Sequence, residues 1–498
     1  MAPGLFSSDR PPWGLQWRSK RSFIIATVAV GLFTDLFLYG LVVPVLPFML
    51  KQRLDIADED VQTYVSGLLA AYAGASVCFS LPAGWIADRT SSRQAPFLCG
   101  LAALLLATIM LALGQSIAIL VVARILQGTS AAVVWTIGLA MVLDTVGLEN
   151  LGKVIGTIFS FISVGELLAP VLGGVLFDKA GYKGVFGVAS GILALDFIMR
   201  LLIIERKTAI KYDPSLDDGL SNPRDFDARE EGEDAHEETA LLPKSDDDDD
   251  EESYRIKTEP GRLVRAFPLL YCFRNPRLLV ALLLAFVQAS FLGVFDATIP
   301  TEAKDLLGFS SLQAGMLFIA LDIPYLILGP LAGWAVDKYG TKPAAVLGFA
   351  YLVPALILLR IPGDAAHTTT NGGTLDNDKQ QHITTLFAAM LSLNGVGLAI
   401  IGSPSIVEAS AVVQRYDQAN RGFFGANGPY AQLYGFNSLF FCSGLAVGCS
   451  EGGAGGRRGA GHEAPCTISM EGDSEQGVVL LTSHGRTAFH TPERTLHG

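Results

Sequence analysis

A carboxylate and a tyrosine lie one helical turn apart inside the first apolar stretch of the chain. Asp35, Tyr39, Gly40, Pro44 and Pro47 follow the pattern D-x-x-x-Y-G-x-x-x-P-x-x-P. Because an apolar medium disfavours a bare charge, a carboxylate there either holds a proton or ionises to meet a cationic ligand or partner. Either behaviour suits the exchange of protons for cations, so Asp35 and Tyr39 are candidate binding residues.

Further acidic residues recur in apolar surroundings later in the chain. Asp296 and Glu408 are the main candidates, and Asp322, Glu166 and Asp196 are of the same kind. Ionisable residues inside a membrane commonly mark the paths of protons or ions. The alternative is that Asp296 and Glu408 lie at the membrane surface as solvated acids.

The elements that must position these residues are apolar helices. Of the 498 residues, 50% are hydrophobic and 17% charged, which is more apolar surface than one soluble core would bury. A run of about 20 apolar residues crosses roughly 30 Å of hydrocarbon. Eleven such runs lie near 22–48, 62–86, 95–114, 116–144, 153–177, 184–204, 278–300, 311–335, 343–360, 383–407 and 430–448. The sequence predicts an all-α protein of the lipid bilayer, and the first run is too long for a cleaved signal peptide.

A polar segment divides the apolar runs into two sets. Residues 205–262 contain the acidic run Asp246 to Glu252, and between Glu205 and Glu259 there are 20 acidic and 8 basic residues, which matches the net charge of −12 of the whole chain. Such a segment buries too little apolar area to fold. The predicted organisation is an N-terminal segment 1–21, a six-helix half 22–204, a disordered linker 205–262, a half 263–448 with five recognisable helices, and a tail 449–498.

Basic residues of the short loops predict the orientation of the chain. They fall on one side of the membrane if the helices alternate, and by the positive-inside rule that side is cytoplasmic, with the N-terminus and the linker. The residues are Arg18, Lys20, Arg21, Arg89, Arg93, Arg274, Arg277, Lys338 and Lys342.

A short sequence pattern occurs at equivalent places in both halves. Gly84-Trp-Ile-Ala-Asp88-Arg89 ends the second apolar run, and Gly333-Trp-Ala-Val-Asp337-Lys ends the eighth. The echo indicates duplication of a six-helix unit. Glycine allows close helix approach, and the acidic and basic pair can cap helix ends and bridge neighbouring helices. The alternative is that the charges, Arg93 included, are ordinary loop flanks.

Two further apolar runs carry residues that suggest coupling. Arg124, Gln127 and Gly128 form R-x-x-Q-G in the fourth run, where an arginine needs a polar interior or partner unless it snorkels near a helix end. The fifth run contains a regular set of small residues and a proline, which are typical of tight helix packing and a bend, or simply of a packing helix. The set is Gly156, Gly165, Pro170, Gly173 and Gly174.

These motifs together resemble the major facilitator superfamily. The pattern from Gly84 to Arg93 is similar to its loop signature, although Ser91 and Ser92 replace the usual glycine and basic residue. The fifth run resembles the signature of the twelve-helix drug:proton antiporter group, with Ala169 in place of a glycine. The resemblance implies two six-helix halves and exchange, with an occluded interface that limits proton leak.

The Asp35 pattern and Ser-Pro-Ser-Ile-Val-Glu408-Ala-Ser look like the vesicular amine transporter branch. In that branch carboxylates of the first, seventh and tenth helices bind cations and protons. The resemblance implies Asp35, Asp296 and Glu408 as substrate and proton residues, and Tyr39 lies beside them.

The C-terminal tail departs from this pattern. After Gly448 the sequence turns polar, and no apolar run in 449–498 is long enough to span a bilayer. The twelfth helix is therefore missing or replaced, and the tail is either the product of a shifted reading frame or a genuine eleven-helix variant.

The overall expectation is proton-coupled antiport of small organic cations, amines or drugs at a vacuolar, vesicular or plasma membrane. A proton-coupled nutrient importer and a non-transporting scaffold or receptor remain alternatives. The six cysteines are scattered and give no disulfide or zinc pattern. The sequence also contains no enzymatic or nucleotide-binding motif. We therefore expect no catalysis, no metal, no cofactor and no nucleic-acid partner. Glu237, Leu241 and Leu242 fit an acidic dileucine signal for a sorting adaptor.

Overall fold

The regular structure of the chain is helical throughout the part that the structure describes. The computed structural model describes residues 12–90, 92–213, 254–256, 261, 264, 267–307, 309, 311–362, 377–420, 422–425 and 427–459. It divides into two compact units, Met1–Gly456 and Arg457–Gly498. The helices that concern function belong to the first unit.

The first half contains the first six predicted runs in five long helical segments. They are α2 (Arg21–Val42) with η1 (Val43–Val45) and α3 (Leu46–Leu54), α4 (Asp58–Arg89), α5 (Gln94–Leu113), α6 (Ile117–Val146) and α7 (Leu151–Leu202). Two short helices flank this half, α1 (Leu15–Arg18) and α8 (Arg206–Tyr212). The tightened turn η1 coincides with Pro44, which cannot donate a backbone hydrogen bond.

Helix α7 combines the fifth and sixth predicted runs. Gly181 interrupts it with φ 59° and ψ −156°, a combination that residues with a Cβ rarely adopt. Two helices therefore meet at a kink at Gly181 without an intervening loop, as the two separate predicted runs require.

The second half contains five predicted runs in six helices. They are α12 (Pro276–Leu307), α13 (Ser311–Tyr339), α14 (Thr341–Leu358), α16 (Asn377–Ile401), α17 (Pro404–Ala419) and α18 (Tyr430–Gly459), preceded by η3 (Pro268–Arg274). The tenth run is broken before Pro404, which begins α17. Glu408 therefore lies in the first two turns of α17 and not at the end of the helix that carries the run.

Within the described residues, nine segments are long and apolar enough to cross a membrane. They contain ten of the eleven predicted runs, because Leu151–Leu202 counts once. Helix α18, which carries the eleventh run, is not among them.

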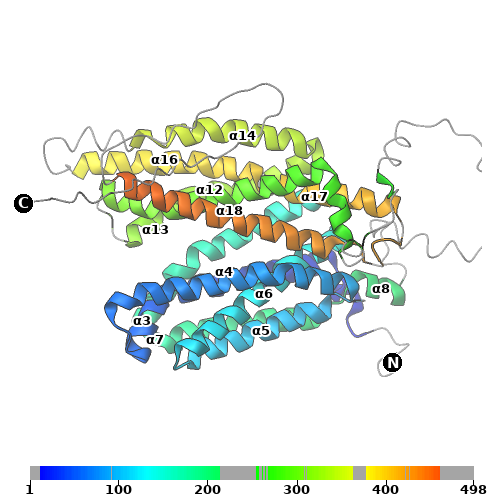
Figure 1. Cartoon of the computed structure of the whole chain (residues 1–498), viewed down its shortest axis with the longest axis horizontal. Helices are drawn as coiled ribbons and strands as arrows, with labels where there is room; N and C mark the ends of the chain where they lie inside the picture. Colours follow the sequence, from blue (N-terminus) through cyan, green and yellow to red (C-terminus); the bar gives the residue numbers. More distant parts are fainter. Residues whose placement is uncertain are drawn as a thin grey trace, which may run out of the picture. The chain divides into compact units, whose positions relative to one another are not determined.

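The packing explains how two halves become one unit. In the first half α6 packs on α4 and α5, and in the second half α16 packs on α13 and α14 (Figure 1). Helix α2 also packs on α7. Each half has its own apolar cluster, and a further cluster joins both halves. Between the halves, α7 packs extensively on α13.

Both edges of the predicted linker have structure. Helix α8 occupies Arg206–Tyr212, inside the segment predicted to be disordered from residue 205. At the other edge, Asn420 donates to the carbonyl of Tyr254 at 2.8 Å and accepts from the amide of Ile256 at 2.7 Å. The prediction for residues 205–262 was therefore wrong at these edges, because local hydrogen bonds and the burial of Tyr254 fix the chain there.

The start of the predicted tail also differs. Helix α18 continues to Gly459, beyond the expected end at residue 448. Residues 460–498 and the dileucine motif at Glu237, Leu241 and Leu242 lie outside the described part of the chain.

Candidate functional site

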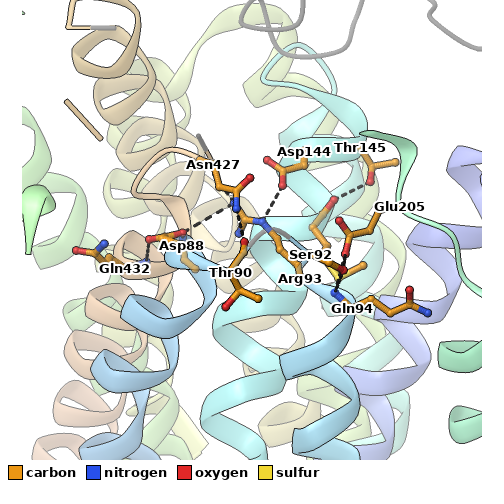
Figure 2. Close-up of polar contacts among 12 residues, drawn as sticks. Asp88, Thr90, Ser92, Arg93, Gln94, Asp144, Thr145, Glu205, Asn427 and Gln432 are labelled. Atoms are coloured by element: carbon orange, nitrogen blue, oxygen red, sulfur yellow. Dashed lines mark hydrogen bonds and ion pairs between the residues drawn. The ribbon is translucent and has the colours of Figure 1, made fainter. Parts of the chain in front are cut away.

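Asp88 connects the C-terminus of α4 to the N-terminus of α18. Its carboxylate oxygens accept hydrogen bonds from the backbone amides of Ala431 and Gln432, each at 2.9 Å (Figure 2). A buried negative charge at a helix N-terminus satisfies amides that have no intrahelical partner and interacts favourably with the helix dipole. Asp88 thus holds the first half against the second; we call this contact the first latch.

Arg93 extends the first latch. Its guanidinium is 3% exposed, forms an ion pair with Asp144 of α6 at 2.9 Å and lies 3.9 Å from Asp88. Burial alone would lower the pKa of Arg93, but the carboxylates of Asp144, Asp88 and Glu205 raise it above its ordinary value. The arginine is therefore permanently charged and ties α6 to the end of α4.

Hydrogen bonds to the connecting loops surround this pair (Figure 2). Asn427, before α18, donates to the carbonyl of Thr90 at 2.6 Å and accepts from Arg93 at 3.3 Å. Glu205 accepts from the amide of Gln94 at 2.6 Å and from the Ser92 hydroxyl at 2.8 Å. Ser92, a departure from the family signature, is thus part of the network through a hydroxyl instead of a positive charge.

Asp337 forms an equivalent second latch. Its carboxylate accepts from the amides of Gly152 and Lys153, at the start of α7, at 2.7 and 2.8 Å. Gly333 lies one turn earlier, and a Cβ on it would overlap the carbonyl of Gly152. The repeated sequence pattern therefore makes the same contact twice, with α4 on α18 and with α13 on α7.

The remaining residues of the first pattern have distinct positions. Gly84 faces α18 so closely that a Cβ would lie 2.5 Å from the carbonyl oxygen of Ala431. Arg89 is exposed, and its guanidinium lies 4.2 Å from the ring centroid of Trp85. We call the end of the helices that carries both latches the gate end.

The first-helix candidates lie inside the first half. Asp35 has no exposed surface, and its Oδ2 accepts a hydrogen bond from the Tyr72 hydroxyl of α4 at 3.3 Å. The ring of Tyr72 packs on Tyr39 with 4.6 Å between centroids. Trp135 of α6 is near Asp35 as well. Asp35 and Tyr39 therefore both contact Tyr72, and their role in binding substrate or protons stays a prediction.

Arg124 and Gln127 lie in the same region. The Arg124 guanidinium is fully buried, donates to Gln127 Oε1 at 2.8 Å and lies 5.7 Å from the centroid of Tyr39. It lies about two turns after the start of α6. The complete burial of its side chain disagrees with snorkelling, the alternative considered from the sequence, and the role of Arg124 in coupling stays a prediction.

The small residues of α7 pack against α2. A Cβ at Gly165 would lie 2.6 Å from the ring of Phe33, and one at Gly173 would overlap the carbonyl of Leu41. Pro170 lies inside the helix near Gly40, whereas Gly174 has open space around its Cα. The motif thus places α7 directly beside the helix that carries Asp35.

Asp296 lies among other acidic residues, on the second half. It interacts electrostatically with Glu166 of α7 and with Asp322 of α13. Asp296 and Glu166 are both exposed to solvent in the structure. This exposure agrees with both interpretations made from the sequence, a binding residue and a solvated acid, so the role of Asp296 stays a prediction.

Glu408 is separate from these carboxylates. It forms an ion pair with Arg277, the second residue of α12, at 2.7 Å and accepts from the hydroxyl of Thr341, the first residue of α14. These contacts join three helices of the second half. Its role in binding substrate or protons stays a prediction, and the contacts themselves are those of a structural ion pair.

Several contributing residues were not singled out from the sequence. Tyr72, Asp144 and Asn427 each complete a contact with a predicted residue. Only Asp144 carried a signal, as an acidic residue late in an apolar run. A tyrosine and a loop asparagine are too common in such segments to be recognised without their neighbours.

Comparison with known proteins agrees with this arrangement. The family model described as the Major Facilitator Superfamily matches residues 28–449. The chain belongs to the major facilitator superfamily. Its family consists of membrane transporters, and the match ends where the sequence becomes polar after Gly448.

Individual relatives extend this result. The chain is 52% identical to the MFS-type transporter ppzB of Metarhizium rileyi over 89% of this chain and 90% of that protein. It is 32% identical to the vesicular acetylcholine transporter of Torpedo marmorata over 38% of this chain and 42% of that protein. The crystal structure of the human organic anion transporter MFSD10 (TETRAN) has a TM-score of 0.50 at 18% identity, with 90% of this chain and 96% of that chain covered.

Proposed function

We propose that this chain exchanges protons for small organic cations by alternating access. The observation that carries the proposal is Asp35, a fully buried carboxylate that contacts Tyr72 within the first half. A carboxylate in this position binds either a proton or an organic cation, and hydrocarbon disfavours the bare charge. One carboxylate can therefore make the two ligands mutually exclusive, which is the requirement for antiport.

The relatives support the cationic class of substrate. Acetylcholine, for which one relative is named, is a quaternary ammonium ion. The shared segment is limited to 38% of the chain, so the support concerns the charge of the substrate and not its identity. Asp296, with Glu166 and Asp322 beside it, supplies further negative charge on the opposite half.

The latches suggest how access alternates. Both latches join one half to the other at the gate end, so this end is closed in the structure. Opening that end requires the release of Asp88 and Asp337 from the two helix N-termini. By the positive-inside rule we assign the gate end and the N-terminus to the cytoplasm, which makes the closed gate cytoplasmic.

The driving force follows from simple terms. A pH difference of one unit supplies about 1.4 kcal/mol per proton, and a potential of 100 mV supplies about 2.3 kcal/mol per charge moved. Export across the plasma membrane and sequestration in a vacuole both use these gradients. The dileucine motif at Glu237, Leu241 and Leu242 favours a vacuolar or vesicular membrane through a sorting adaptor.

The test is uptake driven by a pH gradient into vesicles that contain the full chain. Labelled aromatic amines and cationic dyes are the probes, and Asp35→Asn is compared with Asp178→Asn, the same change at an exposed site. We expect accumulation that depends on the gradient, is lost in Asp35→Asn and is kept in Asp178→Asn. Accumulation that requires the opposite gradient would indicate a nutrient importer, and none with any probe would favour a scaffold or receptor.

A further inference from the structure

Arg124 is a buried cation without an anionic partner among the described residues. Its Nη1 donates to Gln127, whereas Nε and Nη2 have no hydrogen-bond partner in that part of the chain. A guanidinium is always protonated and carries five N–H donors. Leaving such a group buried without a counter-charge is expensive, so the position calls for an anion that binds there.

Two other buried arginines of the described chain show what a satisfied site looks like. Arg200 is fully buried and forms an ion pair with Asp196 at 2.7 Å, with a second hydrogen bond at 2.8 Å. Arg93 pairs with Asp144 at 2.9 Å. The fold thus supplies a carboxylate in both cases, and Arg124 differs from them.

The surroundings of Arg124 suggest the shape of its ligand. The guanidinium lies 5.7 Å from the ring centroid of Tyr39, which packs on Tyr72 at 4.6 Å, and the Tyr72 hydroxyl contacts Asp35. A positive and a negative group thus each lie near one tyrosine of an aromatic pair. Tyr39 and Tyr72 are partly accessible, whereas Asp35 and Arg124 have no exposed surface.

We propose that this site takes an organic zwitterion, with its ammonium group at Asp35 and its carboxylate at Arg124. The inference rests on the proposed function and narrows its substrate class from cations to cations that also carry a carboxylate. A planar or aromatic middle part would contact Tyr39 and Tyr72, and both tyrosines must rotate to admit it. A simple amine would satisfy Asp35 but leave Arg124 unpaired, so it would bind more weakly.

The first test measures binding and does not depend on transport. The purified full chain in lipid nanodiscs, in chloride-free buffer, is titrated with tyrosine, tyramine or tyrosine methyl ester while its thermal unfolding is followed. We expect tyrosine to bind about 10- to 100-fold more tightly than the other two, as for one charge-assisted hydrogen-bonded pair. Equal affinity of the three probes, or no stabilisation by tyrosine, would overturn the proposal.

Variants of Arg124 locate the effect. Arg124→Gln should abolish the preference for tyrosine over tyramine, whereas Arg124→Lys should recover part of the preference. Arg255→Gln, a change at an exposed arginine, should alter neither. Equal weakening of both probes by Arg124→Gln would mean that the arginine only positions the tyrosines, which contradicts carboxylate binding.

Two further measurements separate carboxylate binding from a structural role of Arg124 and from a halide site. Without ligand, Arg124→Gln should unfold at the same or a higher temperature than the wild type, because it removes an unpaired buried charge. A decrease in unfolding temperature as large as that of Arg200→Gln would overturn the proposal.

Stabilisation of the wild type by chloride alone, with no effect of tyrosine, would identify a halide site instead. Uptake of tyramine driven by a pH gradient tests the proposed function separately, since a chain that exchanges tyramine but does not prefer tyrosine refutes only the zwitterion.

Discussion

Replacing Asp88 by asparagine should open the gate end. The Asp88 side chain is 3% exposed, and its carboxylate accepts from the amides of Ala431 and Gln432 at 2.9 Å. Asparagine keeps one acceptor oxygen, so one buried amide loses its partner and the other bonds to a neutral group. The charge at the N-terminus of α18 and the contact with Arg93 disappear as well.

The size of the effect follows from these changes. A buried amide without a partner costs about 1–3 kcal/mol, and exchanging a charged for a neutral acceptor costs about 1 kcal/mol. Loss of the charge at the helix N-terminus adds about 0.3–1 kcal/mol. The closed gate should therefore lose roughly 2–5 kcal/mol relative to the open gate, which is a shift of about 30- to 5,000-fold in their ratio.

Spin labels on Glu149, between α6 and α7, and on Lys342, at the start of α14, would report the separation of the halves. Both residues are exposed, and the six native cysteines are replaced first. The distance distribution of Asp88→Asn should gain a longer component that Asp178→Asn lacks. An unchanged distribution in Asp88→Asn would refute the view that this carboxylate holds the gate closed.

Three other substitutions test separate contacts. Gly156→Val should open the same gate, because its Cβ would overlap a carbonyl of α13, whereas Gly174→Val has open space and should leave the spin-label distances unchanged. Asp196→Asn or Arg200→Met alone should each lower the free energy of unfolding by about 3–5 kcal/mol, since each leaves a fully buried charge unpaired. The double variant should lose less unfolding free energy than either single variant, as measured by thermal unfolding. A loss in the double variant equal to the sum of the two single losses would contradict this pairing. Glu408→Gln should lower thermal stability, because its carboxylate pairs with an arginine. Proton-driven uptake that is kept in this variant would assign Glu408 a structural role, and loss of coupling with unchanged stability would support the proton-binding role predicted from the sequence.

Much of the fold was predictable because the bilayer imposes a simple rule on sequence. Any spanning helix must be apolar for about 20 residues, and ten of the eleven predicted runs lie in segments long and apolar enough to cross a membrane. The break between 153–177 and 184–204 was also expected, although no loop separates these helices at Gly181. The prediction of disorder was wrong at the edges of the linker. Apolar content predicts neither a short helix such as α8 nor a side chain such as Asn420 that hydrogen-bonds the backbone of a distant segment.

The candidate site was predictable in part. A charge within an apolar run stands out, so Asp35, Arg124 and Asp296 were recognisable as functional candidates from the sequence. The repeated pattern likewise identified Asp88 and Asp337 as equivalent residues. What the pattern does not contain is the partner of each charge.

Tertiary structure decided those partners. Arg277 lies 131 positions from Glu408, and Ala431 lies 343 positions from Asp88; nothing in the local sequence couples such residues. The sequence by itself determined which side chains enter the membrane, because hydrocarbon selects residues one at a time by their polarity. Only the packing of α2, α4 and α6 decided that Asp35 meets Tyr72 while Arg124 meets no acid in the described chain, because pairing depends on which helix faces lie together.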